Sequence, residues 1–174
     1  EVNDHWMPDE GREAYRLFNE NRISRPYQKL DNEQVHSSWS NAIVTIAEQI
    51  DKTDRNKIAV IGSPHASVEE NYVLSRLASL LGLNDAVFTP HVEEGKGDGF
   101  LITDDLAPNA NGCRILGMSE KTPHDISAMV DKAEVVILLS DHLIDRGIVN
   151  EEQLKDTFMI SFTTNHTDPT GGAD

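Results

Sequence analysis

The chain has 174 residues, of which 38% are hydrophobic and 26% charged, and its formal net charge is −15. This length is sufficient for one compact domain with its own core. The negative charge argues against nucleic-acid binding, which needs a basic face to neutralise phosphates. The longest apolar run, Val135-Val-Ile-Leu-Leu139, is strand-sized. A membrane span needs roughly 20 apolar residues, so we expect no direct membrane insertion.

The cysteine and histidine content limits the metal sites that this chain can build. Cys113 is the only cysteine, which excludes an internal disulfide and any multi-cysteine site. The seven histidines are scattered without ligand spacing. We therefore expect no complete iron–sulfur or zinc site, and a reducing, cytoplasmic setting. Cys113 itself is expected to be a small buried hydrophobe.

The first third of the chain changes character near residue 31. Residues 1–30 are polar and irregular, with a short amphipathic helix predicted near Leu17 and an extended arm ending at Pro26. A helix is then predicted with Asp31 or Asn32 as its N-cap. Its apolar residues recur at helical spacing: Val35, Trp39, Ala42, Ile43, Ile46, Ala47 and Ile50. We therefore divide the chain into a leading segment, 1–30, and an α/β domain, 31–174.

Four apolar runs in the second segment predict strands, at 57–62, 86–88, 134–139 and 158–162. Continuous apolar runs of this length are typical of strands buried on both faces. Because the runs alternate with helical patterns, we predict a doubly wound parallel sheet of order 2-1-3-4. The stretches 93–99 and 104–112 are expected to be irregular excursions outside the sheet.

Two helix starts are well marked. Ser67-Val-Glu-Glu70 is a capping box, and Thr122-Pro-His-Asp125 repeats the pattern with proline at the first helical position. The first helix is expected to end at Gly82 and the second near Ala133. A further short helix is predicted at 151–155. The expected buried stripes are Val73, Leu77, Leu80 and Leu81 in the first helix, and Ile126, Met129, Val130 and Ala133 in the second.

Ligands of open α/β sheets bind beyond the C-terminal ends of the strands. A histidine follows each predicted strand, at positions 65, 91, 142 and 166, but no triad order or ligand spacing accompanies them. We therefore assign no catalytic residue. The turn from Gly62 to Ser67 has one glycine and a proline, followed by Glu69 and Glu70. A dinucleotide-binding turn needs more glycine and no carboxylate beside the phosphate, so this turn is expected to cap a structural helix.

Several segments resemble one family in the same order along the chain. They are Trp6-Met-Pro-Asp-Glu-Gly-Arg12, Asn19-Glu-Asn-Arg-Ile-Ser-Arg-Pro26, the stretch from Ile58 to Tyr72, the stretch from Phe100 to Gly112, and the end of the chain from Thr167. Together they resemble the large iron–sulfur subunit of bacterial NADH–quinone oxidoreductases, whose C-terminal part has the fold of molybdopterin oxidoreductases.

The resemblance implies a scaffold that has lost one metal site. In that family a cysteine of a four-iron cluster stands where this chain has Pro8, and proline cannot ligate iron. The parent subunit would carry 4Fe-4S and 2Fe-2S clusters elsewhere, with no metal or pterin in this chain. The other subunits of the peripheral electron-transfer arm would be its partners, at the cytoplasmic face of the inner membrane. The parent complex would be an oxidoreductase, whereas this chain alone would not be catalytic.

A second interpretation stays open. The chain would then be part of an active molybdopterin enzyme, similar to a formate dehydrogenase, and would hold part of a guanine dinucleotide cofactor. The contacts expected for that cofactor are Ser63, His65, Ser140, Asp141 and Asn165. Under either interpretation we expect the chain to be a piece of a longer protein.

Overall fold

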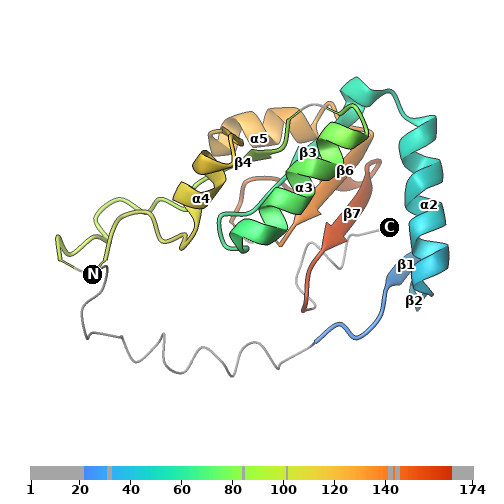
Figure 1. Ribbon diagram of the computed structural model, residues 1–174, viewed down its shortest axis with the longest axis horizontal. Coiled ribbons are helices and arrows are strands. Elements are labelled where there is room, and N and C mark those ends of the chain that lie inside the picture. The colour runs from blue at the N-terminus through green and yellow to red at the C-terminus, as the bar shows by residue number, and fades with distance from the viewer. Residues whose placement is uncertain are drawn as a thin grey trace.

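The computed structural model describes residues 22–30, 33–83, 85–100, 102–140, 143 and 146–165. The amphipathic helix predicted near Leu17, together with Pro8, Asp141, His142 and His166, lies outside the described residues. The described part forms a parallel sheet with helices on both of its faces (Figure 1). None of its helices is long and apolar enough to cross a bilayer.

The main sheet has five strands in the order β5-β4-β3-β6-β7, and each neighbouring pair is parallel. The four predicted strands, numbered in chain order, correspond to β3, β4, β6 and β7. Their predicted order 2-1-3-4 is therefore confirmed, since the sheet places them as β4-β3-β6-β7. β5 was not predicted, because two residues are too few to show a period. The strands are β3 (Ile58–Ile61), β4 (Val87–Phe88), β5 (Ser119–Glu120), β6 (Val135–Leu139) and β7 (Phe158–Phe162).

The two central strands explain why the sheet is parallel and buried. All residues of β3 and β6 are buried, and their register pairs Ile58 with Val135 and Ile61 with Leu138. Uninterrupted apolar residues of this kind suit strands that are covered on both faces. The apolar runs therefore determine both the strands and the need for helices above and below them.

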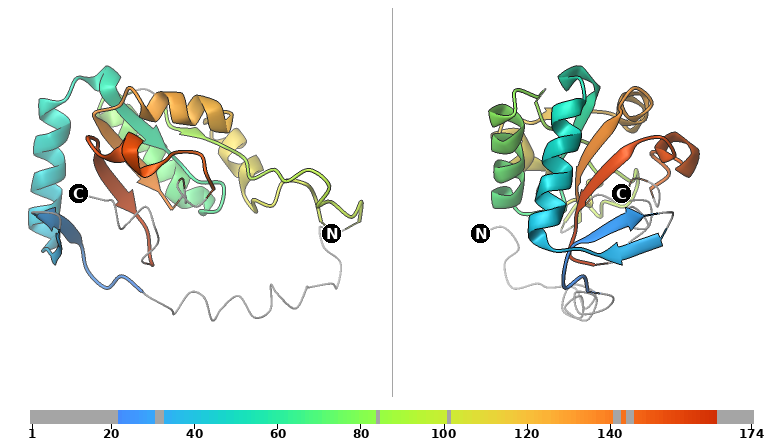
Figure 2. Two further views of the ribbon diagram at one scale, coloured as in Figure 1. Left: turned by 180° about the vertical axis from the view of Figure 1, so that it is seen from behind. Right: turned by 90° about the vertical axis from the view of Figure 1, so that its right-hand side faces the viewer.

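One face of the sheet is covered by α3 (Val68–Leu80) and α4 (Ala110–Ile115), while α2 (Trp39–Lys52) runs beside β7 (Figures 1 and 2). Their buried side chains share one core cluster with this face, which includes Ile50, Leu74, Ala78, Phe88, Cys113 and Ile137. The irregular stretch was predicted to extend to residue 112, which is wrong, because α4 already begins at Ala110. Six residues are too short for a helical period to be recognised.

The opposite face is covered by α5 (Pro123–Val130) and α6 (Glu151–Leu154) (Figure 2). The predicted stripe of α5 is confirmed: Ile126 and Val130 are buried in the second core cluster, with Met129 and Ala133 packed against it. Both predicted capping boxes are also present. Ser67 accepts a hydrogen bond from the Glu70 N–H, and Thr122 accepts one from the Asp125 N–H.

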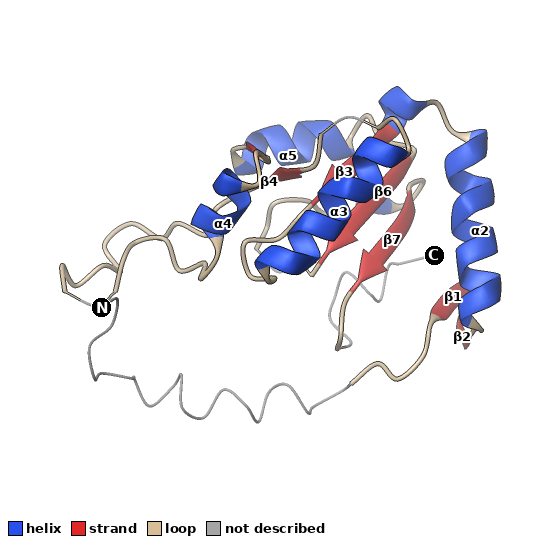
Figure 3. Ribbon diagram, in the orientation of Figure 1, coloured by secondary structure: helices blue, strands red, loops and turns tan. Residues whose placement is uncertain are grey.

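The predicted start of the first helix is wrong. Residues on either side of 31–32 form a small antiparallel hairpin, β1 (Tyr27–Leu30) and β2 (Glu33–His36), which pairs Gln28 with Val35 (Figure 3). The helix begins only at Trp39, where the Ser38 hydroxyl accepts a hydrogen bond from the Asn41 N–H at 3.1 Å. Val35 fitted the helical spacing by coincidence. The paired strands β1 and β2 lie on the two sides of this boundary, and the division of the chain there remains a prediction.

The predicted stripe of α3 is wrong for two residues. Val73 and Leu80 are 64% and 77% exposed, whereas Asn71, Leu74 and Ala78 face the sheet and are buried. The side of the helix that packs on the sheet carries Leu74, the small Ala78 and the polar Asn71. Close approach explains this choice, because α3 lies so near β3 that a Cβ on Gly62 would meet Asn71 Oδ1 at 2.6 Å.

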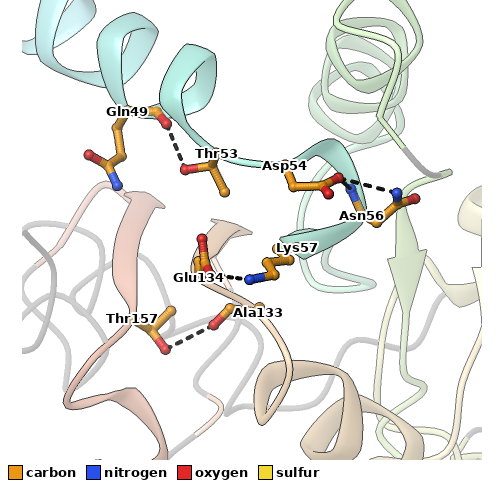
Figure 4. A network of polar contacts seen from close by, with 8 residues as sticks. All are labelled: Gln49, Thr53, Asp54, Asn56, Lys57, Ala133, Glu134 and Thr157. Atoms are coloured by element: carbon orange, nitrogen blue, oxygen red, sulfur yellow. Dashed lines mark hydrogen bonds and ion pairs between the residues drawn. The ribbon is translucent and has the colours of Figure 1, made fainter.

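Structural contacts connect the residues at the N-terminal ends of the strands (Figure 4). The Glu134 N–H donates to the Lys57 carbonyl at 2.9 Å, and the Phe158 N–H donates to the Glu134 carbonyl at 2.9 Å. The Lys57 ammonium also pairs with the Glu134 carboxylate, and this hydrogen bond is the main reason why the pKa of Lys57 is raised. These contacts align the starts of β3, β6 and β7, whereas ligands of open α/β sheets bind beyond the opposite, C-terminal ends of the strands.

Candidate functional site

The topological switch point of the sheet lies between β3 and β6. The chain moves outward from β3 to β4 and β5, then returns to β6 on the other side of β3. Ligands of open α/β sheets bind in the crevice beyond the strand ends at such a point. Here Ser63 follows β3, is fully buried, and donates its hydroxyl to the Ser140 carbonyl at 3.3 Å. The crevice is thus bridged by the protein itself.

The turn between β3 and α3 has no donor left for a phosphate. Pro64 has no N–H, and every other residue from Gly62 to Ser67 already donates its N–H inside the protein. The acceptors, in chain order, are the Val87 carbonyl (2.8 Å), Asn71 Oδ1 (3.1 Å), Ser63 Oγ (3.1 Å), the Ser63 carbonyl (3.2 Å) and Glu70 Oε2 (2.8 Å). A phosphate-binding turn works by aiming such N–H groups at the ligand.

Asn71 organises this turn and was not recognised from the sequence. Its amide is fully buried and also donates to the carbonyls of Ser63 and Ser67, at 2.8 and 3.0 Å. The same packing favours glycine at position 62, since a Cβ there would meet Oδ1 of the buried, hydrogen-bonded Asn71. A signal did exist: Asn71 lies three residues before Leu74 and seven before Ala78, so a polar residue occupies the sheet-facing stripe.

The polar groups after β6 are also engaged. Ser140 has a positive φ of 43°, which is rare for a residue with a side chain. Its N–H and its hydroxyl both donate to the Phe162 carbonyl, at 3.0 and 2.9 Å. Asn165 lies farther along and forms an isolated antiparallel β-bridge with Arg22. Its side-chain oxygen accepts a hydrogen bond from Thr164 Oγ1 at 2.7 Å.

The structure therefore brings together only part of the predicted cofactor site. Ser63 and Ser140 are in direct contact, and His65 lies two residues beyond Ser63. Asn165 belongs instead to the junction with the N-terminal arm. Asp141 lies outside the described residues, so its place in this set remains a prediction.

Two of the four strand-end histidines meet. His65 Nε2 lies 3.1 Å from His91 Nδ1, and His91 Nε2 lies 3.4 Å from a Glu93 carboxylate oxygen. Asp105 accepts a hydrogen bond from the His91 N–H at 3.3 Å. In the part of the chain that the structure describes, no three His, Cys, Asp or Glu side chains converge as a metal site. The pair connects the β3–α3 turn to the loop after β4.

A cavity of about 360 Å³ opens beside the ends of β6 and β7, between the hairpin and α2. Its size falls within the range of small-molecule sites. Its lining is mainly apolar and includes Trp39, Leu139, Ile160 and Phe162. Glu70 also lines it, but that carboxylate accepts hydrogen bonds from the N–H and hydroxyl of Ser67. None of these five side chains is a free nucleophile or general base.

Cys113 of α4 and Thr89 after β4 are also fully buried. Burial raises the pKa of the Cys113 thiol, which is fully shielded, so the predicted role as a buried hydrophobe is confirmed. Thr89 follows β4 and is also fully buried, and its hydroxyl oxygen has no hydrogen-bond partner. Its only signal in the sequence was its place at a strand end.

Comparison with known proteins agrees with this architecture. Residues 22–160 match the molybdopterin oxidoreductase family. The chain belongs to that family. It is 33% identical over 125 residues to the G subunit of NADH-quinone oxidoreductase from Rickettsia prowazekii, a match that covers 69% of this chain and 18% of the relative.

Two further relatives carry similar names. The corresponding G subunit from Rickettsia conorii is 34% identical over 85 residues, which is 49% of this chain and 13% of that protein. NADH-quinone oxidoreductase subunit 3 of Thermus thermophilus is 26% identical over 93 residues, which is 53% of this chain and 11% of that protein. The chain therefore spans less than a fifth of the length of these relatives.

The family raises the question of whether a pterin dinucleotide fits this site. The N–H donors of the β3–α3 turn and the hydroxyls of Ser63 and Ser140 are all committed to internal bonds. Glu69 and Glu70 stand in the first turn of α3, where they complement the helix dipole in place of an anion. The residues present do not fit the pyrophosphate of such a cofactor.

Proposed function

We propose that this chain is part of the large iron–sulfur subunit of an NADH–quinone oxidoreductase, in which it supports the electron-transfer arm without binding metal or pterin itself. The names of its relatives supply the context. The observation that carries the supporting role is the switch point, where the Ser63 hydroxyl bonds to the Ser140 carbonyl and bridges the crevice.

The energetic cost of opening that crevice supports the proposal. A phosphate would have to displace the buried hydrogen bonds of Ser63, and leaving a buried polar group unpaired costs about 1–3 kcal/mol. It would also approach the carboxylates of Glu69 and Glu70, which carry the same sign of charge. A supporting domain needs none of these groups to be free, and the internal bonds then stabilise the fold.

The remaining parts of the proposal follow from the resemblance. The 4Fe-4S and 2Fe-2S clusters belong to other parts of the parent subunit, and Pro8 replaces the ligand expected in this chain. The division at residue 30 separates the tail of the iron–sulfur module from the molybdopterin oxidoreductase-like domain. The partners are other subunits of the peripheral arm at the cytoplasmic face of the inner membrane. Catalysis belongs to the parent complex.

A comparison of two kinds of variant in the full-length subunit tests this role. Ser63→Ala and Ser140→Ala alter the strand ends, whereas Ile126→Asp places a charge in the core cluster between the sheet and α5. If the chain has a supporting role, Ile126→Asp should lower the amount of assembled complex. NADH–quinone turnover per assembled complex should stay at the wild-type value for all three variants. Native gels quantify assembly, and turnover is measured on the same membranes.

The opposite result would contradict the proposal. If Ser63→Ala or Ser140→Ala lowers turnover per complex at least tenfold while assembly is unchanged, these residues act on a cofactor. Reconstitution of the purified chain with iron and sulfide is a second check. We expect no cluster absorbance, and a stoichiometric four-iron spectrum would contradict a chain without metal.

The second candidate is an active molybdopterin oxidoreductase in which this domain contacts a guanine dinucleotide. The unpartnered hydroxyl of buried Thr89 is the observation that favours it, because it is an unused polar group next to the β3–α3 turn. Equilibrium dialysis with GMP and GDP separates the two candidates. Micromolar affinity supports the cofactor role, and failure to saturate at millimolar nucleotide supports the scaffold.

A further inference from the structure

The turn between β3 and α3 is joined to the loop after β4 by two histidines. His65 lies in the turn, and His91 begins the loop. We call residues 91–106 the β4 loop, which extends away from the sheet (Figure 1). Its base is closed by a backbone bond in which the Leu106 N–H donates to the His91 carbonyl at 2.8 Å. The position of His91 therefore sets the base of the loop.

The contact between the two rings is a hydrogen bond that needs one proton. His65 Nε2 lies 3.1 Å from His91 Nδ1, and the rings meet edge to face. One nitrogen must donate an N–H and the other must accept it. The second nitrogen of His91, Nε2, lies 3.4 Å from a Glu93 carboxylate oxygen, which only accepts. This network assigns the His91 proton to Nε2, so in the neutral pair His65 donates and His91 Nδ1 accepts.

The number of bound protons decides whether this bond can exist. A pair with one added proton keeps the bond, because the charged ring donates to the neutral one. With two added protons, both facing nitrogens carry an N–H and no acceptor remains. Two cations then face each other at hydrogen-bonding distance, and their repulsion opposes the contact.

The charges around the pair separate these two protonation steps. Those that the structure describes are the carboxylates of Glu69, Glu70, Glu93 and Asp105 and the cations of Lys96 and Arg146. The acidic majority, and Glu93 above all, favours the first added proton. The second proton must be added beside an existing cation, so the pair titrates in two coupled steps.

We propose that the hydrogen bond between His65 and His91 is a pH-dependent tether, which holds the start of the β4 loop against the β3–α3 turn until both rings are charged. The inference concerns this chain alone and does not depend on the proposed function. Farther along, the Asn109 N–H donates to the Pro64 carbonyl at 2.9 Å, so the end of the loop stays attached when its start is released. Release loosens the sheet at the strand ends where ligands of such folds bind.

Nuclear magnetic resonance of the ¹⁵N-labelled chain tests both parts of the proposal. The pH is lowered from about 8 to about 5, the range in which imidazoles ordinarily change charge. We expect the ring nitrogens to titrate in two steps, with scalar coupling between His65 Nε2 and His91 Nδ1 lost only in the second. Exchange of the Leu106 N–H, corrected for its intrinsic pH dependence, should rise about fivefold in that second step, the factor of one ordinary hydrogen bond. The buried Ile137 N–H of β6 is the internal reference.

Two variants of the exposed His65 separate the tether from other effects of pH. In His65→Gln the amide can donate or accept but cannot titrate, so Leu106 exchange should stay slow over the whole range. In His65→Ala the bond is absent, so exchange should be fast at every pH. His124→Gln changes another exposed histidine, on α5, and should behave as the wild type.

Three results would overturn the proposal. A rise in Leu106 exchange that is equal in the wild type and in His65→Gln would mean that another group opens the loop. Two-step ring titration without any change in Leu106 exchange would mean that the pair does not hold the loop. Absence of scalar coupling at every pH, with each ring titrating independently, would mean that the two histidines are not bonded.

Discussion

The two faces of the central sheet are covered in different ways. On one face, α5 and α6 bury their apolar stripe and present polar groups outward. Gln153 of α6 donates to the Ser127 hydroxyl at 2.9 Å and to the Asp131 carboxylate at 2.6 Å, which joins the two helices. On the other face, α3 buries one apolar stripe and leaves Val73 and Leu80 exposed. The helices of the first face are joined by polar side chains, whereas the helix of the second face exposes apolar side chains beside its polar ones.

This difference shows what hydrophobic periodicity can and cannot indicate. Both helices have apolar residues at helical spacing, and both are opened by a capping box. In α5 one stripe exists, so its buried side follows from the spacing alone. In α3 apolar residues lie on more than one side, and the small residues Ala78 and Gly62 decide which side approaches the sheet.

The largest expected effect contrasts one apolar residue from each face. Ile126→Ala removes a fully buried side chain from the α5 core and should lower the free energy of unfolding by about 2–5 kcal/mol. Leu80→Ala removes a side chain that is 77% exposed, so the change in this chain should stay within about 0.5 kcal/mol. Urea unfolding of both variants measures the difference. Similar losses for the two would show that α3 is oriented otherwise.

The next effect concerns the polar group that anchors α3. Asn71→Ala leaves the buried Ser63 N–H without its acceptor and removes two donated hydrogen bonds. We expect a loss of about 2–4 kcal/mol in the free energy of unfolding, since unpaired buried groups cost about 1–3 kcal/mol each. The exposed neighbour Tyr72→Ala is the control and should change it by less than about 1 kcal/mol. A loss no larger than that of the control would exclude Asn71 as the anchor.

The sequence was sufficient for those parts of the fold that are set by local chemistry. Continuous apolar runs identified β3, β6 and β7, and the hydroxyl–carboxylate pairs identified the starts of α3 and α5. The parallel order followed because the strands alternate with helices. These features depend on neighbours in the chain, so no long-range contact was needed to recognise them.

The parts that failed depend on contacts between distant residues. The hairpin at Tyr27 to His36 is decided by strand pairing, which outweighed a helical spacing that included Val35. The candidate site was predicted only as a set of strand ends. Ser63 and Ser140 are 77 residues apart in the chain. Local sequence patterns do not show whether two such distant residues are free or hydrogen-bonded to each other.

A smaller effect is expected at the two helix caps. Thr122→Ala in α5 and Ser67→Ala in α3 each remove the hydroxyl that accepts an N–H bond from the first turn. Each should lower the free energy of unfolding by about 1 kcal/mol. Thermal unfolding measures both, and the exposed Ser79→Ala in α3 should have no comparable effect. A cap loss near zero on one side would show that its helix is held by packing alone.

The smallest effect is a pH dependence confined to the α5 cap. Hydrogen bonds from the Thr122 hydroxyl and N–H lower the pKa of Asp125 below its ordinary value of 3.8. A depressed folded-state pKa stabilises the fold above the unfolded pKa, and this contribution is lost as the pH falls through the folded pKa. Asp125→Asn cannot titrate, so it should be less stable than the wild type near neutral pH. The difference in melting temperature should then shrink as the pH falls below about 4. A difference that stays constant over that range would mean that Asp125 acts through hydrogen bonding that is independent of its charge.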